Sequence, residues 1–249
     1  MPKETFFNLS PEKRSHILET AISEFAERSY TGFSITHMVT RAGIAKGSFY
    51  QYFENKLDLY RYLLLNVWVE RKTSFLKSRL PPSGDGFFGA VRHLLLTGIA
   101  FGLSQPRMAA MFRPVLSPWA GDEELGALQQ ETLAYQRASF LNLIEQGQAQ
   151  GQVRRDLNLE TAADLLMAIT RDGIDRAMSR IMGMTLVELC ARPKRAAEFD
   201  EEDRAALVDE VVDLLRRWLG VSAGAPAETA GGGIDIDALA DTRPVREGP

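Results

Sequence analysis

The sequence predicts an all-α fold, with an amino-terminal three-helix helix-turn-helix module joined by a long fourth helix to a larger helical domain. Apolar residues recur at spacings of three and four in almost every segment, and no stretch of any length alternates as a strand would. Capping and breaking residues separate these stripes. At 249 residues and 45% hydrophobic composition, the chain can bury a sizeable core.

The first helix is expected to begin at Ser10 and Pro11, because serine caps a helix and proline is favoured at its first position. Its apolar stripe consists of Leu18, Ala21, Ile22 and Phe25. A break at residues 30–32 ends it. Ser34 can cap a second helix that runs to about Ala42 and is followed by a turn at Gly43.

The third helix is expected at residues 46–52, and Asn55 can cap a fourth helix that ends before the prolines at 81 and 82. Residues 81–86 are typical of a linker. Further helices are expected at 86–103, 105–113, 122–150, 159–182 and 202–219. The domains are therefore predicted as a DNA-binding domain at 1–54, an effector-binding and dimerisation domain at 55–219, and a flexible acidic tail at 220–249.

Charge is distributed unevenly along the chain. Residues 1–80 contain 12 Lys and Arg against 8 Asp and Glu, whereas the other 169 residues contain 17 against 25. A basic amino-terminal module on an acidic body is expected when only one end meets a polyanion.

The stretch "THMVTRAGIAKGSFYQYFENK", residues 36–56, points to that polyanion. We expect its inward side chains to pack against the stripe of the first helix; they are Met38, Val39, Ala42, Ile44, Phe49 and Phe53. The outward residues of the third helix would be Lys46, Gly47, Ser48, Tyr50, Gln51 and Tyr52. A helix, a glycine turn and a helix with a polar outer face form a helix-turn-helix arrangement.

The outward residue types suit a DNA duplex. Lys46 can meet a phosphate or a guanine edge, Gln51 can pair with an adenine edge, and the tyrosine hydroxyl groups can donate to phosphate oxygens. Gly47 permits close approach of the backbone, and Lys56 adds charge at a helix amino terminus. A helical hairpin with a merely solvated face is the alternative.

The segment "GFSITHMVTRAGIAKGSFYQYFENKLDLY", residues 32–60, closely resembles the DNA-binding module of the tetracycline-repressor (TetR) family of bacterial transcription regulators. The resemblance extends over about residues 10–65, and "GQAQGQVRRDLNLETAADLL" at 147–166 looks like the ligand-binding half. It implies base contacts from Thr36, Ala45, Lys46, Gly47, Ser48 and Gln51. It implies phosphate contacts from Ser34, Tyr50, Tyr52 and Lys56.

Two residues depart from the family pattern. Ala45 stands where a serine or a similar capping residue is common, so we expect no side-chain cap on the third helix. Gln51 replaces a frequent histidine, so a different base preference is expected.

Two apolar stripes near the carboxyl terminus suit burial between subunits. The first consists of Ala162, Leu166, Ile169, Gly173 and Ala177, and the second of Val208, Val211, Leu215 and Trp218. Paired across two subunits they would form a four-helix bundle, and a homodimer would place two recognition helices in successive major grooves. The alternative is that these stripes bury only core within one chain.

The middle of the chain is rich in large, soft apolar groups that can enclose a ligand cavity. The candidate ligand residues are Trp68, Phe101, Met108, Met111, Phe112, Trp119 and Tyr135, with Asp172 and Arg176 as polar anchors. As the resemblance implies, a small effector would favour a conformation whose recognition helices no longer match the groove spacing. We expect that effector to be largely apolar, although each residue is also compatible with ordinary core.

The competing classes are an enzyme and a helical interaction protein. The three histidines are isolated from any nucleophile, and Cys190 is the only cysteine, so no catalytic site, metal site or cofactor is expected. The start of the chain lacks an apolar run of signal-peptide length, and a cytoplasmic protein with no membrane partner is expected. Repression is commoner in the family than activation, and the sequence does not distinguish them.

Overall fold

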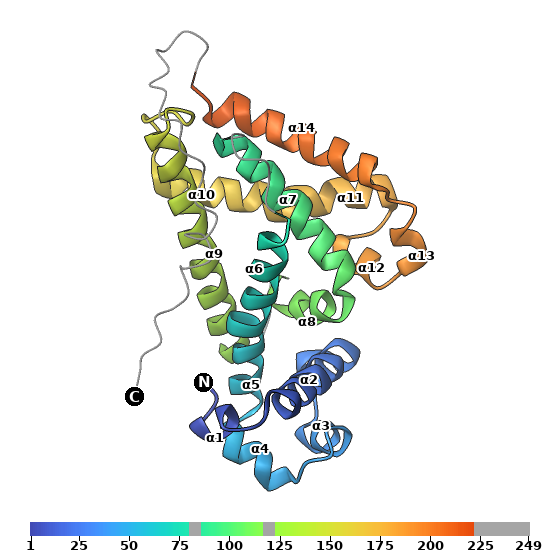
Figure 1. Cartoon of the computed structure of the whole chain (residues 1–249). Helices are drawn as coiled ribbons and strands as arrows, with labels where there is room; N and C mark the ends of the chain where they lie inside the picture. The colour runs from blue at the N-terminus through green and yellow to red at the C-terminus, as the bar shows by residue number, and fades with distance from the viewer. Residues whose placement is uncertain (80–85, 117–122, 222–249) are drawn as a thin grey trace. The chain divides into compact units, whose positions relative to one another are not determined.

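The computed structural model describes residues 1–79, 86–116 and 123–221, and these residues are helical apart from loops and one isolated bridge between Val153 and Gly220 (Figure 1). The prediction of an all-α fold is confirmed. The expected linker at 81–86 and the expected tail at 220–249 lie largely outside the described residues.

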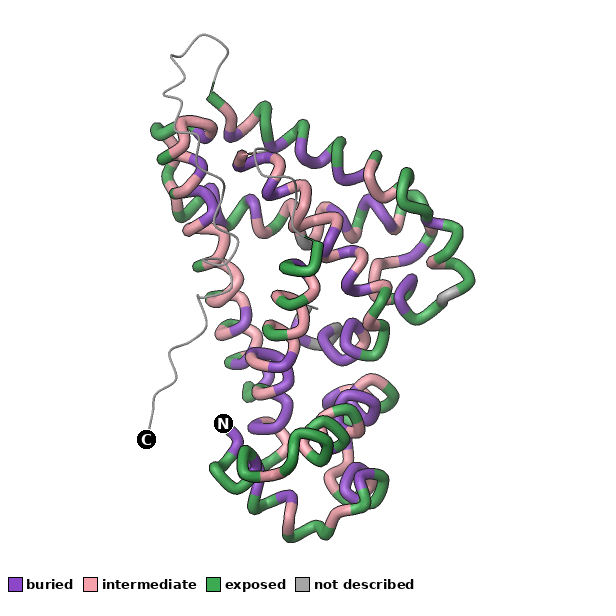
Figure 2. Tube along the Cα trace, in the orientation of Figure 1, coloured by how far each residue is buried: buried purple, intermediate pink, exposed green. Residues whose placement is uncertain are grey.

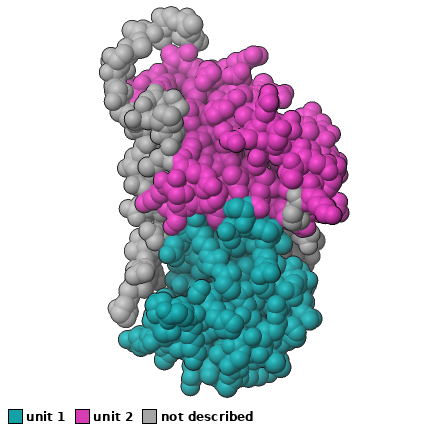
Figure 3. Space-filling view, turned by 45° about the vertical axis from the view of Figure 1, so that its right-hand side comes forward, with its two compact units in different colours: residues 1–71, 104–132 teal, residues 72–103, 133–249 magenta. Residues whose placement is uncertain are grey.

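The chain divides into two compact units, which Figure 3 colours teal and magenta. Unit 1 contains residues 1–71 and 104–132, and unit 2 contains residues 72–103 and the chain from 133 onward. These units are defined by packing. The domain boundary expected at 54/55 is a functional one and stays a prediction.

The first four helices of unit 1 are α1 (Glu4–Phe7), α2 (Pro11–Gly32), α3 (Ile35–Arg41) and α4 (Lys46–Tyr52). The expected caps are present: the Ser10 hydroxyl accepts from the amide of Lys13 at 3.3 Å, and that of Ser34 from the amide of His37 at 3.3 Å. Regular α2 geometry is interrupted at Ser29, whose φ is 59°. Helix α1 was not predicted.

The small core predicted for unit 1 is present. Met38, Phe49 and Phe53 are fully buried, together with Ile22 and Phe25 of α2. One detail differs from the expected stripe of α2, because Ile17 is buried while its neighbour Leu18 is only half-buried.

The long helix expected after Asn55 is α5 (Lys56–Tyr62), a π-helical stretch η1 (Leu63–Trp68) and α6 (Val69–Lys77). Asn55 caps it, accepting from the amide of Asp58 at 2.9 Å. Helix α8 (Pro106–Leu116) packs on α2, and the buried hydroxyl of Tyr60 donates to the carbonyl of Met111 at 2.7 Å. Unit 1 also contains the first part of α9 (Glu123–Ala149).

Unit 2 contains α7 (Gly86–Ser104), the rest of α9, α10 (Leu159–Ala168), a π-helical stretch η2 (Ile169–Gly173), α11 (Ile174–Met182) and α14 (Glu201–Leu219). Two short helices, α12 (Leu186–Cys190) and α13 (Pro193–Ala196), fall in a segment that was predicted as a break. Figure 2 shows buried residues recurring along α7, α11 and α14, whose apolar side chains form one core cluster.

The two stripes predicted to lie between subunits are largely buried within the chain itself. Ala162, Leu166, Ala177, Val208, Val211 and Leu215 all belong to the core cluster of unit 2, while Ile169 and Trp218 pack against it. Assigning the fully buried members to a subunit interface is therefore wrong, because α10, α11 and α14 use these faces to cover α7 and α9. The alternative, core within one chain, holds for them.

Within the described ranges, α7 is the one helix whose length and composition would allow it to cross a membrane. Core helices of soluble proteins meet the same two criteria. Phe87, Val91 and Ile99 of α7 are buried in the core cluster of unit 2, which accounts for its apolar composition.

Candidate nucleic-acid interface

The predicted recognition surface consists of α3, the turn at Gly43 and α4. Gly43 has a φ of 62°, the left-handed conformation that glycine adopts without strain, and it turns the chain sharply from α3 toward α4. Ala45 occupies the N-cap position of α4 without a side-chain hydrogen bond, as predicted from its departure from the family pattern.

Most of the expected DNA-contacting residues lie on the surface. Thr36, Ala45, Lys46, Gly47 and Gln51 are exposed, as is Tyr50, whose exposed fraction is 45%. Ser34 and Ser48 are half-buried. A Cβ atom added at Gly47 would meet nothing within 4 Å, so the surface there is open to a large partner.

The expected outward position of Tyr52 is wrong. Only 7% of this residue is exposed, and its ring lies 6.0 Å from that of Phe6, a residue of α1. The sequence pattern of α4 did not show this, because the partner comes from a segment about 45 residues earlier in the chain.

Lys56 begins α5 and is half-buried against the end of α2. Its Nζ donates to the carbonyl of Tyr30 at 3.1 Å and lies 4.2 Å from the centre of the Tyr30 ring. The ammonium group carries three donors, so these contacts still leave it able to meet a phosphate.

A buried carboxylate joins α2 to α3. Glu24 is 0% exposed, and its Oε2 lies 2.7 Å from His37 Nδ1 and 3.1 Å from Arg41 Nη1. Its Oε1 lies 2.9 Å from Arg28 Nε without the alignment of a hydrogen bond. Arg41 also pairs with the exposed Glu27, which raises the pKa of Arg41 and lowers that of Glu27. The network holds α3 on α2, and sequence spacing did not reveal it.

Replacing Glu24 by glutamine should lower the free energy of unfolding by about 1–3 kcal/mol, because the carboxylate is the shared counter-charge of three basic side chains. This loss is smaller than that for a fully buried ion pair, since the three basic side chains are partly exposed and water can solvate them. Urea unfolding measures the change. Glu27→Gln is the matched control and should change stability little, because its ion pair is at the surface. Equal stability of Glu24→Gln and the natural chain would contradict the role of the network.

The predicted ligand residues are divided between the two units. In unit 1, Met108, Met111 and Phe112 are buried, and the ring of Trp68 stacks on Phe112 at 4.5 Å. In unit 2, Phe101 is buried 5.4 Å from the ring of Phe75, while Tyr135 and Asp172 are half-buried. Arg176 is exposed in the single chain, and its role as a polar anchor stays a prediction. Trp119 lies outside the described residues.

Lys72 of α6 was missed by the sequence analysis. It is half-buried in unit 2, and the surrounding protein desolvates its ammonium group and lowers its pKa. Within the described part of the chain, no side chain or backbone group forms a hydrogen bond or an ion pair with it. A desolvated ammonium without a counter-charge is costly, which makes Lys72 a candidate for binding an anionic group.

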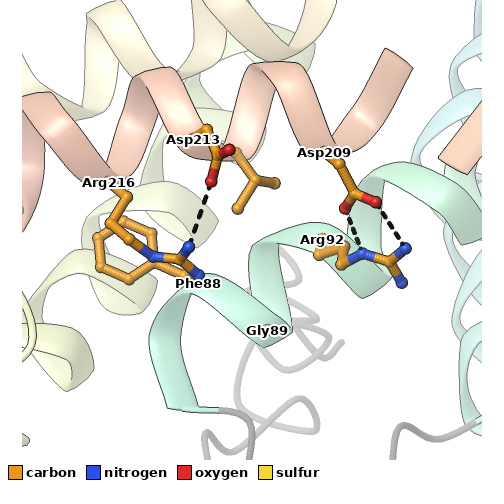
Figure 4. A pocket seen from close by; sticks show the side chains of 7 residues that line it. Phe88, Gly89, Arg92, Asp209, Asp213 and Arg216 are labelled. Carbon is orange, nitrogen blue, oxygen red and sulfur yellow. Dashed lines mark hydrogen bonds and ion pairs between the residues drawn. The ribbon is translucent and has the colours of Figure 1, made fainter. Parts of the chain in front are cut away.

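A surface hollow of about 380 Å³ lies between α7 and α14 in unit 2 (Figure 4). Its charged groups already pair with one another: Arg92 donates to Asp209 at 2.5 and 3.1 Å, and Arg216 to Asp213 at 3.2 Å. Arg216 also lies over the ring of Phe88, 5.2 Å from its centre. The Arg92–Asp209 pair and the contact of Arg216 with Phe88 hold α14 on α7, and the hollow has no unpaired charge for a ligand.

The described residues contain no cluster of three or more His, Cys, Asp or Glu that could hold a metal ion. Cys190 is buried on α12, and burial raises the pKa of its thiol to about 12. Such a thiol stays protonated near neutral pH and is a poor nucleophile.

Two families match this chain. Residues 17–63 match the family described as "Bacterial regulatory proteins, tetR family", and residues 92–172 match "Tetracyclin repressor-like, C-terminal domain". The first match covers α3, α4 and α5 completely, together with most of α2.

Similar proteins include regulators from several bacteria. The crystal structure of a TetR family transcriptional regulator from Chloroflexus aurantiacus J-10-FL is 34% identical, with a TM-score of 0.62, over 89% of this chain and 99% of that one. The "Probable acrEF/envCD operon repressor" of Escherichia coli (strain K12) is 24% identical over 81% of this chain and 86% of its own length. The "HTH-type transcriptional repressor DhaR" of Mycobacterium sp. (strain GP1) is 27% identical over 66% and 81%.

Proposed function

Because the chain belongs to the tetR family of bacterial regulatory proteins, and is therefore a DNA-binding transcription regulator, we propose that it is a repressor. It binds a palindromic operator as a homodimer and is released by a small effector. The exposed polar face of α4, between the turn at Gly43 and the long helix that follows, carries this proposal. The similar proteins from Escherichia coli and Mycobacterium are both named repressors, which supports repression over activation.

Selection of duplexes from a random-sequence library by the full-length chain tests operator binding. We expect the recovered sites to be palindromic and binding to weaken steeply as salt concentration rises, because phosphate contacts release counterions. Recovery of no preferred sequence would contradict the proposal and favour a helical interaction protein. A reporter gene placed behind the recovered site then distinguishes repression from activation by the sign of the response.

The base contacts are assigned to Thr36, Ala45, Lys46, Gly47, Ser48 and Gln51, and the phosphate contacts to Ser34, Tyr50 and Lys56. All of these residues are exposed or half-buried, which supports the assignment. The buried ring of Tyr52 is given a packing role instead.

The homodimer is assigned to the outer faces of α10, α11 and α14. Leu165, Ile181 and Leu214 project there with exposed fractions of 45%, 57% and 57%, although they are large apolar side chains. On α14, Leu214 lies among exposed residues that are mostly charged; they include Asp209, Glu210, Asp213, Arg216 and Arg217. Large apolar side chains that are exposed among charged residues fit a contact with a second copy of the same chain.

The effector is assigned to the interior of unit 2. Lys72 is half-buried in that unit, its ammonium group is desolvated, and it has no counter-charge among the described residues. Phe75 and Phe101 supply apolar surface at the contact between α6 and α7, and Thr97 is buried there. The proposed effector is therefore an apolar molecule that carries one negative charge. This differs from the sequence-based expectation only in the charge.

Lys72→Met should weaken binding of 1-anilinonaphthalene-8-sulfonate by about 10-fold or more, because a hydrogen bond to a charged group contributes about 1.5–3 kcal/mol. Binding of N-phenyl-1-naphthylamine, which has the same rings without the sulfonate, should not weaken. Fluorescence titration measures both. Lys77→Met, on the exposed face of the same helix, is the control. Equal loss for the two dyes, or no binding of either dye to the natural chain, would contradict the assignment.

A further inference from the structure

The recognition helix α4 lacks support of its own at both ends. It has seven residues, fewer than an isolated helix needs to be stable in water, and Ala45 provides no side-chain cap at its start. At its carboxyl end, the last carbonyl groups of any helix have no partner within the helix. The donors that form hydrogen bonds with those carbonyl groups therefore determine whether the last turn of α4 stays helical.

The segment before α2, residues 3–7, supplies the missing donors, and we call this segment the arm. The backbone amide of Lys3 donates to the carbonyl of Tyr52 at 2.8 Å, and the Lys3 Nζ donates to that of Tyr50 at 3.0 Å. The hydroxyl of Thr5 donates to the carbonyl of Gln51. Since the Phe49 carbonyl accepts from the amide of Phe53 at 2.8 Å, all four carbonyls of the last turn have a partner.

Phe6 anchors this segment to the module. It is 0% exposed, its ring lies 4.9 Å from that of Phe53, and it lies 6.0 Å from those of both Tyr52 and Tyr62. The two donor residues, in contrast, are exposed. Apolar burial thus fixes the segment in place, while Lys3 and Thr5 direct their donors at the end of α4. The positive charge of Lys3 also suits the carboxyl end of a helix.

We propose that Lys3 and Thr5 are positioning residues for DNA recognition, which hold the last turn of α4 so that Tyr50 and Gln51 are presented in one fixed direction. The argument is one of preorganisation: a turn that frays in the free protein must be ordered again on the duplex, and that ordering weakens specific binding. Contacts to phosphates from any sequence depend less on this direction. The inference rests on the proposed entry of α4 into the major groove.

Thr5→Val tests the proposal, because valine keeps the shape of threonine and removes only the hydroxyl group. The probe is the duplex recovered by selection with the natural full-length chain, and a scrambled duplex measures non-specific binding. Loss of one uncharged hydrogen bond should lower affinity about five-fold per half-site, or roughly 25-fold for a dimer on a palindrome. Non-specific binding and the thermal melting temperature should not change, and Thr5→Ser should restore specific binding.

Thr20→Val is the matched control, because the Thr20 hydroxyl also donates to a helix carbonyl, that of His16 at 2.8 Å, away from the arm. Amide hydrogen exchange gives a second readout that needs no DNA: the Phe53 amide should exchange faster in Thr5→Val. Unchanged specific binding together with unchanged exchange would overturn the proposal, as would equal losses on the two duplexes. If the natural chain selects no sequence, the proposed function fails, while exchange at Phe53 still decides whether the arm holds α4.

Discussion

Replacing Lys46 by alanine should lower affinity for the selected operator by about 30-fold to 10⁴-fold. Lys46 is exposed at the first position of α4, beside the open surface at Gly47, where its ammonium can reach a guanine edge or a phosphate. A good contact of this kind contributes about 1–3 kcal/mol, and a homodimer loses two of them. Titration of the labelled duplex at several salt concentrations measures the loss.

The salt series also separates the two roles of Lys46. Loss of a phosphate contact in each subunit should reduce the dependence of log affinity on log salt by about 2, nearly equally for all sequences. Loss of a guanine contact should instead relax discrimination at one symmetric pair of operator positions. Lys194→Ala, which removes an exposed lysine of α13, is the control and should bind as the natural chain does. Unchanged affinity of Lys46→Ala would show that α4 does not read the duplex as assigned.

The helix-turn-helix module was predictable because the signals that define it are local. Ser10, Ser34 and Asn55 each accept a hydrogen bond from an amide three residues later, so a cap can be recognised from adjacent sequence alone. Gly43 and the spacing of Phe49 and Phe53 are equally local. Such features need no knowledge of the rest of the fold.

The features missed in the module depend on contacts between distant segments. Tyr52 occupies an outward position by the pattern of α4, but Phe6 covers it. Glu24 is a charged residue in the middle of α2, and its burial depends on His37 and Arg41 arriving from α3. The first nine residues contain no stripe long enough to predict a helix, so the arm was not recognised either.

Helical periodicity correctly predicted which helix faces of unit 2 are buried. It did not predict whether the same chain or a second subunit buries them. Leu166, Val208 and Leu215 recur at helical spacing because they face the core of their own chain. The π-helical stretch at Ile169–Gly173 shifts the register of the helix by part of a turn, and no sequence signal indicated it. A single apolar residue on a polar face, such as Leu214, forms no stripe and was overlooked.

Replacing Leu214 should dissociate the proposed homodimer. Leu214→Glu is expected to raise the dimer dissociation constant by at least 100-fold, because two leucine contacts are lost and two carboxylates must enter the proposed interface. Leu214 is 57% exposed in the single chain, so the variant monomer loses no internal packing and should keep its helical content. Sedimentation equilibrium measures the dissociation constant directly.

Operator affinity should fall when the dimer dissociates, because a single subunit engages only one half-site and loses the combined affinity of two. The loss should therefore shrink as protein concentration rises above the new dissociation constant, a dependence that a damaged DNA surface would not produce. Ala197→Glu places the same carboxylate at an exposed site after α13 and should leave the dimer intact. A dimeric Leu214→Glu would assign the interface to another face, and a monomeric natural chain would remove the homodimer altogether. Either result would leave the single-chain geometry of α4 unchanged, so DNA reading and dimerisation are tested separately.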